Sequence, residues 1–327
     1  MNSLIVLGIL ALFIHGVFFD ATFFKIYIPL VGVYWIWLLT IFAYKDNNWK
    51  RRKITISSWN KPGDPTAYVP IDYDVTELIE YLEKVNNSSN GKNKLTLTYA
   101  CVKAIGIAFT NGISNVGRIA FGSFRGVDQI DIAILADVKK GKDLVPIVIK
   151  HPHSKSLQQI SEDVYNLASR AKAGKDEVHN KNFMIANYIP SFLLGPIITI
   201  GEYISLNLGW DLPLLNAKGD QYPPIVLTNI GTFGLEAGFA PLPPMANLLC
   251  SWMGAVTEKP WIVNGEIKIR KILTIVHTLD HRIGDAAIAV KPLKLIKTIL
   301  ENPKLLETLE YKGNELLNTD VIDIHSN

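Results

Sequence analysis

Two long runs without formal charge at the start of the chain limit what it can fold into. Met1–Phe19 and Ile26–Tyr44 contain only uncharged residues, and six residues separate the two runs. A helix of either length crosses the roughly 30 Å hydrocarbon core of a bilayer. We therefore predict two transmembrane helices in a tight hairpin over residues 1–45. A cleaved signal peptide is the alternative for the first run, but no basic segment precedes it and no small-residue cleavage site follows it.

Basic residues after the second run predict the orientation. They are Lys45, Lys50, Arg51, Arg52 and Lys53. Because lysine and arginine accumulate on the cytoplasmic side of membrane spans, we expect an integral membrane protein whose remaining residues lie on the cytoplasmic (positive-inside) face. The sequons at Asn86 and Asn87 would accept glycans only if this orientation were reversed in a secretory compartment.

Composition excludes several classes of function. The chain has 327 residues, 48% of them hydrophobic, which is enough for a large core. A net charge of +3, without a basic stripe interleaved with aromatic residues, argues against a nucleic-acid partner. Cys101 and Cys250 lie inside apolar runs, so buried thiols are expected rather than a disulfide or a metal site.

From Ile54 onward the pattern alternates between strands and helices. Period-two alternation or short apolar runs predict strands, and apolar residues three or four apart predict helices. Asn264-Gly265 is typical of a hairpin turn between two of the strands. The expected strands are 67–75, 130–138, 143–150, 223–231, 248–263 and 266–282, and the expected helices are 76–86, 95–111, 156–175 and 286–307.

An apolar insertion at about 183–210 interrupts this pattern. Its only formally charged residue is Glu202, while Pro190 and Pro196 argue against one straight helix and favour two short ones. An internal packing hairpin and a membrane-contacting segment both fit this composition. The sequence leaves both open.

Six stretches, in order, resemble the catalytic domain of one enzyme family. They are "RRKI", "YDVTELIEYL", "DLVPIVIKHPHSKSLQQISEDVYNLASRAKAGK", "LTNIGTFG", "FAPLPPMANLLCSWMGAV" and "LDHRIGDAA". Together they resemble the dihydrolipoyl acyltransferases of 2-oxoacid dehydrogenase complexes, whose fold is related to that of chloramphenicol acetyltransferase. The resemblance implies an α/β two-layer sandwich, a mixed sheet with packed helices, in a catalytic domain over residues 46–327 that follows the transmembrane hairpin.

The resemblance also implies the roles of the site residues. His281, in a His-x-x-x-Asp signature, would be the general base, and Thr228 would be the hydroxyl that stabilises the oxyanion. Asp285 would pair with a basic residue and brace the histidine loop. Its partner would be Arg51 or Arg52, and the sequence does not decide which.

Other polar residues near His281 have simpler interpretations. His277 falls on the same face of a strand as His281, and a core or interface histidine with satisfied hydrogen bonds is the favoured interpretation over a second group in the channel. Asp280 and Arg282 are expected to form a structural ion pair. The chain has Ala286 where the family signature has glycine, and Gly284 at a usually apolar position. If the glycine of the family signature has a left-handed backbone conformation, alanine at that position would cost about 1–2 kcal/mol.

The resulting hypothesis is a membrane-anchored acyltransferase that uses acyl-coenzyme A as co-substrate and a lipid-like or membrane-associated acceptor. The resemblance further implies a homotrimer in which the histidine and the hydroxyl come from adjacent chains. Neither a lipoyl attachment site nor a metal is expected, and the sequence does not identify the residues that bind coenzyme A. The alternative is a catalytically inactive membrane scaffold or subunit of a larger assembly. A soluble antibiotic-type acetyltransferase is disfavoured by the two apolar runs.

Overall fold

The computed structural model describes residues 29–34, 36–37, 65–88, 93–137, 144–173, 191–212, 223–242, 248–309, 311–312 and 315–316. Residues 29–34 and 36–37 are helical, and the rest of the predicted transmembrane hairpin, like Arg51 and Arg52, lies outside these ranges. Among the helices that are described, none combines the length and the apolar character that crossing a membrane requires.

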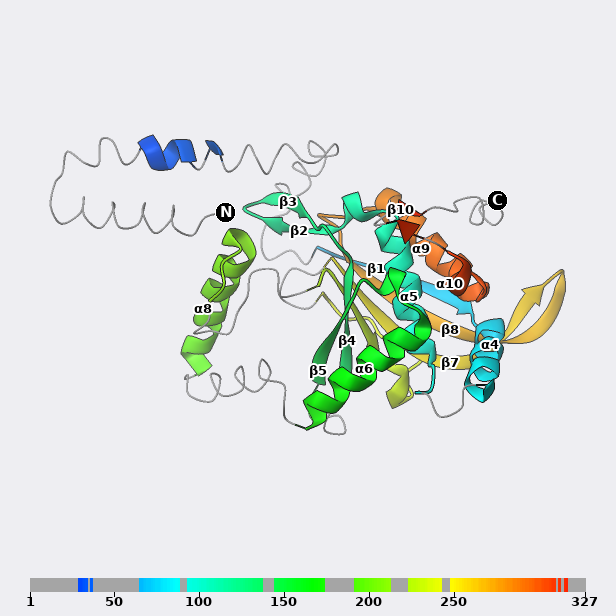
Figure 1. The fold of residues 1–327 in the computed structure, drawn as a ribbon. Coiled ribbons are helices and arrows are strands. Elements are labelled where there is room, and N and C mark those ends of the chain that lie inside the picture. Colours follow the sequence, from blue (N-terminus) through cyan, green and yellow to red (C-terminus); the bar gives the residue numbers. More distant parts are fainter. Residues whose placement is uncertain are drawn as a thin grey trace.

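A six-stranded mixed sheet forms the centre of the fold, in the order β1-β8-β7-β6-β4-β5 (Figure 1). β6 runs parallel to both β4 and β7, and the other neighbours are antiparallel. The strands are β1 (Thr66–Asp74), β4 (Asp131–Asp137), β5 (Leu144–Lys150), β6 (Ile225–Asn229), β7 (Leu249–Val263) and β8 (Glu266–Asp280). The six strands predicted from period and composition are confirmed, with ends shifted by a few residues.

The described helices that pack on this sheet gather on one of its faces (Figure 1). They are α4 (Thr76–Ser88), α5 (Leu97–Thr110), α6 (Leu157–Lys172), α9 (Ala286–Glu301) and the short α10 (Leu305–Thr308). α6 begins with the capping box formed by Ser156 and Gln159. The predicted closing helix, 286–307, is interrupted after Glu301, because Pro303 cannot continue it.

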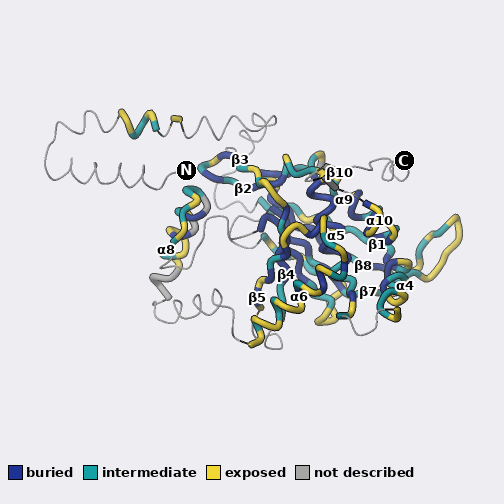
Figure 2. Tube along the Cα trace, in the orientation of Figure 1, coloured by how far each residue is buried: buried dark blue, intermediate teal, exposed yellow. Residues whose placement is uncertain are grey.

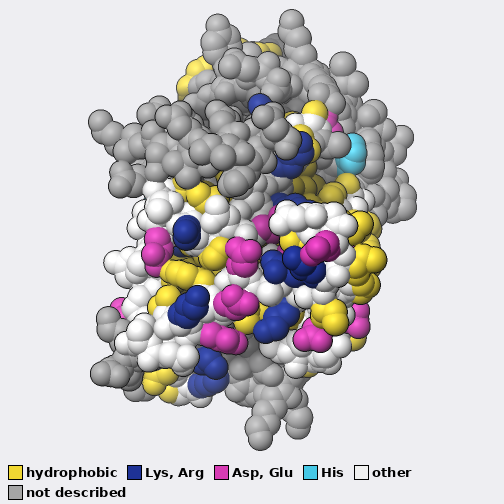
Figure 3. All heavy atoms as spheres, turned by 90° about the vertical axis from the view of Figure 1, so that its right-hand side faces the viewer, with side chains coloured by type: hydrophobic (Ala, Val, Ile, Leu, Met, Phe, Trp, Pro, Cys, Tyr) yellow, Lys and Arg dark blue, Asp and Glu magenta, His cyan; other side chains and the backbone are white. Residues whose placement is uncertain are grey.

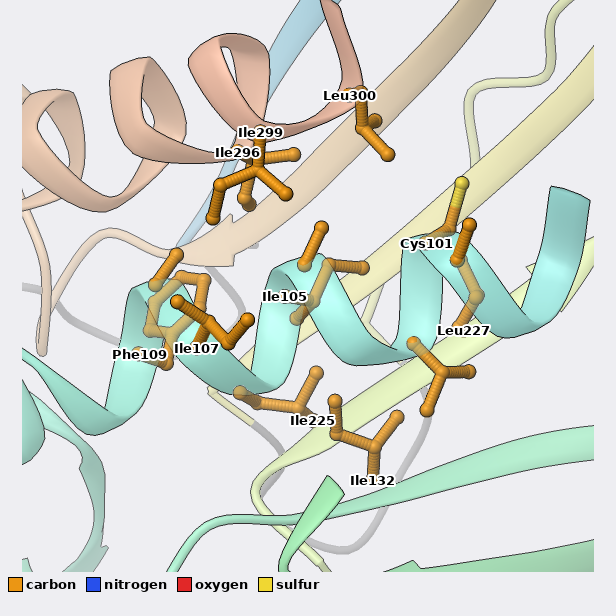
Figure 4. Packing of buried hydrophobic residues seen from close by; sticks show 14 of the residues in the cluster. Cys101, Ile105, Ile107, Phe109, Ile132, Ile225, Leu227, Ile296, Ile299 and Leu300 are labelled. Atoms are coloured by element: carbon orange, nitrogen blue, oxygen red, sulfur yellow. The ribbon is translucent and has the colours of Figure 1, made fainter. Parts of the chain in front are cut away.

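The main core lies between α5, α9 and the strands. Every residue of α5 from Ala100 to Thr110 is buried, as its nearly unbroken apolar sequence predicts (Figure 2). Ile132, Ile225 and Leu227 reach it from the sheet, and Ile296 and Ile299 reach it from α9 (Figure 4). This packing fixes β6 against α5.

Two hairpins project from the sheet body. The small one, β2 (Gly117–Ala120) with β3 (Ser123–Gly126), was not predicted, because its glycine-rich sequence shows no clear alternation. The large one is the outer part of β7 and β8, which turns at Asn264 and Gly265 with the positive φ angles that this turn requires. The face at that end of the molecule carries basic and acidic side chains interspersed (Figure 3), and Arg270 pairs with Asp74 at 2.6 Å.

The described part of the apolar insertion is one helical segment. α8 (Ser191–Glu202) runs directly into a single π-helical stretch, η4 (Tyr203–Leu208). Pro196 lies inside α8 and does not end it. Pro190 and the start of the insertion lie outside the described ranges, so the pair of short helices stays a prediction. A proline inside a helix removes one backbone donor, and here the helix continues despite that loss.

Candidate active site

Thr228 lies on the face of the sheet that the helices do not cover. Along β6, Ile225 and Leu227 belong to the main core, whereas Val226 packs with Ala133 and Cys250 in a second, smaller cluster. Because side chains alternate along a strand, Thr228 shares the face of Val226. It is only 7% exposed, so its hydroxyl sits in a protected place at the end of the strand.

Trp252 is the neighbour of Thr228 across the parallel β6–β7 pair. It packs against the same small cluster, and its indole nitrogen is buried with no hydrogen-bond acceptor in the part of the chain that the structure describes. Leaving such a donor unpaired costs on the order of 1–3 kcal/mol. Trp252 was not singled out from the sequence. Its only signal was a bulky aromatic residue in a predicted strand, and the strand that pairs with "VLTNIG" is known only from the structure.

A strap, residues 234–242, crosses the same face of the sheet. The Ala255 amide donates to the Leu235 carbonyl at 2.8 Å, and the Thr278 hydroxyl donates to the Ala240 carbonyl at 3.1 Å. Gly254 is required here, because a Cβ atom would lie 1.8 Å from the Glu236 carbonyl oxygen. The strap therefore lies directly on β7 and β8.

Large apolar side chains on this strap and beside it are exposed. Phe233 is 61% exposed, Leu235 54% and Phe239 62%, and the ring of Phe239 meets Tyr68 of β1 edge-on. Contiguous exposed apolar patches commonly mark sites of interaction with other molecules. The strap gives the open face of the sheet an apolar surface.

His281 comes directly after β8 and is exposed. Its backbone amide donates to the Pro65 carbonyl at 2.8 Å, and the turn that follows is closed by the Ile283 and Gly284 amides on the Asp280 carbonyl. Arg282 binds the Asp280 carboxylate through two nitrogens, at 3.0 and 2.7 Å, so the predicted structural ion pair is confirmed. These contacts fix the backbone on both sides of His281.

Asp285 is the N-cap of α9. Its carboxylate accepts a hydrogen bond from the Ile288 amide at 3.1 Å, and a negative charge is favourable at the amino end of a helix. Ala286 is the first residue of α9 and therefore has right-handed backbone geometry, so the strain considered for this alanine does not arise. The predicted pairing of Asp285 with Arg51 or Arg52 involves residues outside the described ranges.

The ring of His277 is completely buried on the helix side of the sheet. Its Nε2 atom lies 2.7 Å from the Tyr73 hydroxyl oxygen, and its Nδ1 atom lies 2.9 Å from Ser251 Oγ. Burial lowers the pKa of His277 to about 3, and burial also raises the pKa of Tyr73 well above its ordinary value. His277 is thus a neutral core histidine with both ring nitrogens satisfied, as favoured from the sequence.

Thr228 and His281 do not meet within one chain. Thr228 is level with Trp252 on β7, which is level with Val276 on β8, and His281 lies five residues beyond Val276. Five residues of strand and two strand spacings place the two backbones about 20 Å apart. The structure brings neither side chain to the other, so a site that uses both needs a second subunit.

A pocket of ≈ 320 Å³ lies behind Thr228, on the helix side of the sheet. Asn229 lines it, donates to the Thr98 hydroxyl at 3.0 Å and accepts from the Thr232 amide at 3.3 Å. These bonds hold the turn that follows Thr228. Neither Thr228 nor His281 lines the pocket, and no cluster of metal-ligating side chains occurs among the described residues.

The sequence matches the family described as 2-oxoacid dehydrogenases acyltransferase (catalytic domain), over residues 54–199 and 222–308. The chain belongs to this family. The match leaves out residues 200–221 of the acyltransferase domain, which overlap the later part of the insertion predicted at 183–210. The mixed sheet with helices on one face is the fold that this family resemblance implied.

Relatives and solved structures agree with this assignment. The acyltransferase domain is 24% identical over 268 residues to the dihydrolipoyllysine-residue acetyltransferase component of pyruvate dehydrogenase complex of Zymomonas mobilis, covering 80% of this chain and 50% of that protein. The chain thus spans about half the length of the curated relatives it matches.

Two solved structures share the fold. The dihydrolipoamide acetyltransferase of Azotobacter vinelandii superposes with a TM-score of 0.54 at 17% identity, covering 75% of this chain and 84% of that one. The cubic core of a pyruvate dehydrogenase multienzyme complex gives 0.55 at 16% identity, covering 79% and 87%.

Proposed function

We propose that the protein is a membrane-anchored acyltransferase that uses acyl-coenzyme A and transfers the acyl group to a lipid-like or membrane-associated acceptor. Membership of the acyltransferase family supports the reaction class. The Zymomonas relative is named a dihydrolipoyllysine-residue acetyltransferase component of pyruvate dehydrogenase complex. Coenzyme A is therefore the proposed co-substrate.

The spacing of polar residues supports the proposed roles. The Azotobacter enzyme was studied for the catalytic roles of a serine, a histidine and an asparagine; the asparagine follows the histidine by four residues and the serine precedes it by 52. In this chain Asp285 follows His281 by four residues, and Thr228 precedes it by 53. The same order, with one spacing equal and the other different by one residue, favours Thr228 as the hydroxyl and His281 as the base.

The proposed chemistry needs only these two side chains at the reacting atoms. His281 removes the proton of the acceptor as its nucleophile attacks the thioester carbonyl, and the Thr228 hydroxyl donates to the oxyanion that forms. When the carbon–sulfur bond breaks, His281 returns the proton to the coenzyme thiolate. Asp285 caps α9 and so holds the loop of His281 without touching the substrate.

The register that places Thr228 and His281 two strands and five residues apart is the observation that carries this proposal. A working site must combine Thr228 of one chain with His281 of another, as in the proposed homotrimer. The apolar strap on the open face, with Leu235 and Phe239 exposed, supplies a surface for that contact. The sheet face that holds Thr228 would then be covered by a neighbouring subunit.

The membrane part of the proposal concerns location and acceptor. The uncharged runs at residues 1–45 support an anchor, and the basic residues 45–53 support a cytoplasmic catalytic domain. An acceptor drawn from the membrane suits a domain held at its surface. The apolar segment that includes α8 would extend the site toward such an acceptor.

Thiol release from a panel of short and long acyl-coenzyme A donors tests the proposal. Detergent-purified protein is supplied with its own membrane extract and compared with His281→Ala. We expect extract-dependent release that falls by about 10²–10⁴-fold in the variant, the range typical of a lost general base. Equal background release from both proteins, without binding of coenzyme A, would instead identify an inactive membrane scaffold.

A further inference from the structure

α8 and η4 form an apolar helical segment with several exposed side chains. The sequence from Ser191 to Trp210 contains one formally charged residue, Glu202. Ile198 is 44% exposed, Ile200 59% and Tyr203 54%. A helix that is apolar on all sides is normally buried in a protein core or in a membrane. We therefore expect another molecule to cover these exposed side chains.

Contacts with the β2–β3 turn hold the η4 end of the segment in place. The Phe121 amide, in the β2–β3 turn, donates to Asn207 Oδ1 at 2.7 Å, and the rings of Phe121 and Tyr203 meet edge-on with centroids 6.2 Å apart. The body of α8 stands away from the sheet and its helices (Figures 1 and 2). The β2–β3 turn therefore fixes where η4 lies and leaves α8 open.

The chemistry of the segment fits a lipid surface better than a protein partner. Even homodimer interfaces are only about 65% apolar, whereas this segment has almost no charge. Tyr203 and Trp210 follow the isoleucines, and both residue types concentrate at the membrane–water boundary. At 1.5 Å per residue α8 is about 18 Å long, too short to cross a bilayer core of roughly 30 Å.

The helical residues near the N-terminus lie on the same side of the molecule as α8 in the view of Figure 1. Leu30, Val33 and Ile36 of this helix are each more than 60% exposed. They belong to the second uncharged run, the proposed membrane anchor. Both apolar helical segments can therefore face one lipid surface.

We propose that α8 and η4 lie in the surface of the bilayer, with Ile200 in the acyl-chain region and Tyr203 at the headgroup level. The segment is an interfacial contact and not a third span. This inference rests on the membrane location in the proposed function and extends it to a second, independent contact. A fluorescence measurement distinguishes failure of the α8 contact from failure of the membrane location, and it does not depend on turnover.

A fluorescent probe placed at Ile200 tests the contact in the full chain. Ile200→Cys is labelled with an environment-sensitive dye, and the two natural cysteines are buried and stay unlabelled in the folded protein. Tyr165→Cys on α6 is the matched control, because Tyr165 is also a helical residue that is 59% exposed. Both proteins are reconstituted in phosphatidylcholine vesicles with ordinary or brominated acyl chains.

We expect a blue shift and quenching by brominated chains at position 200 and neither effect at position 165. If the protein floats with the vesicles but the dye at 200 remains accessible to soluble iodide, the anchor stands and the α8 contact is refuted. If the blue shift at 200 occurs in detergent without vesicles and grows with protein concentration, a second copy covers α8, and the lipid proposal is also overturned. If the protein does not float at all, the membrane location in the proposed function fails first.

Discussion

At the scale of one residue, His277 shows how burial determines the protonation state of a side chain. Its ring is fully buried between Tyr73 and Ser251, and its pKa is lowered to about 3, below the ordinary value of 6.5. The unfolded chain therefore binds a proton between pH 6.5 and 3 that the folded chain does not. The stability that the neutral His277 contributes is fully present above pH 6.5 and is lost as the pH falls toward 3.

We expect this residue to contribute a slope of about 1.4 kcal/mol per pH unit to the free energy of unfolding between pH 6 and pH 4. Urea unfolding followed by tryptophan fluorescence at several pH values measures the slope. His277→Gln keeps a hydrogen-bonding side chain without titrating in this range, so the slope should decrease by that amount in the variant. An unchanged slope would show that His277 is not the group responsible.

At the scale of an element, Asp285 links the candidate site to α9. The carboxylate caps the helix that follows the His281 loop. Asp285→Ala should lower the free energy of unfolding by about 1 kcal/mol, the usual cost of losing an N-cap, whereas Asp285→Asn keeps the acceptor and should change it little. A loss of ~3–5 kcal/mol in both variants would instead indicate the buried ion pair with Arg51 or Arg52. Thermal or urea unfolding distinguishes the two results.

Local patterns in the sequence predicted most elements but not how they are placed together. Period two identified β1, β7 and β8, the apolar run identified α5, and Asn264-Gly265 identified the hairpin turn. The separation of Thr228 from His281 depends on the register of three strands, which no local pattern encodes. The strap was missed because residues 234–242 have neither helical nor strand period, and the His277 network was missed because Tyr73 and Ser251 come from other strands.

At the scale of the whole molecule, the strap should decide whether subunits associate. Phe239 is 62% exposed in a single chain, so Phe239→Arg should not unfold the subunit. In the proposed trimer the new charge would be buried without a partner, and such a charge is costly. We expect the variant to sediment as a single chain and to lose acyl transfer.

Ile267→Arg, at a position 78% exposed on the far hairpin, is the matched control and should keep both the assembly and the acyl transfer. Intact assembly of the Phe239 variant would argue that subunits do not associate through the strap.

The long β7–β8 pair has a consequence for local stability. Its inner residues have β1 or β6 as further neighbours, but from Lys259 to Arg270 the two strands pair only with each other. The outer half can therefore open without disturbing the core, whereas the inner half opens only when the sheet does. Amide hydrogen exchange should thus divide one continuous hairpin into a fast half and a slow half, with the boundary near the pair Glu258 and Lys271. Two strands that look like one unit would then behave as two cooperative units.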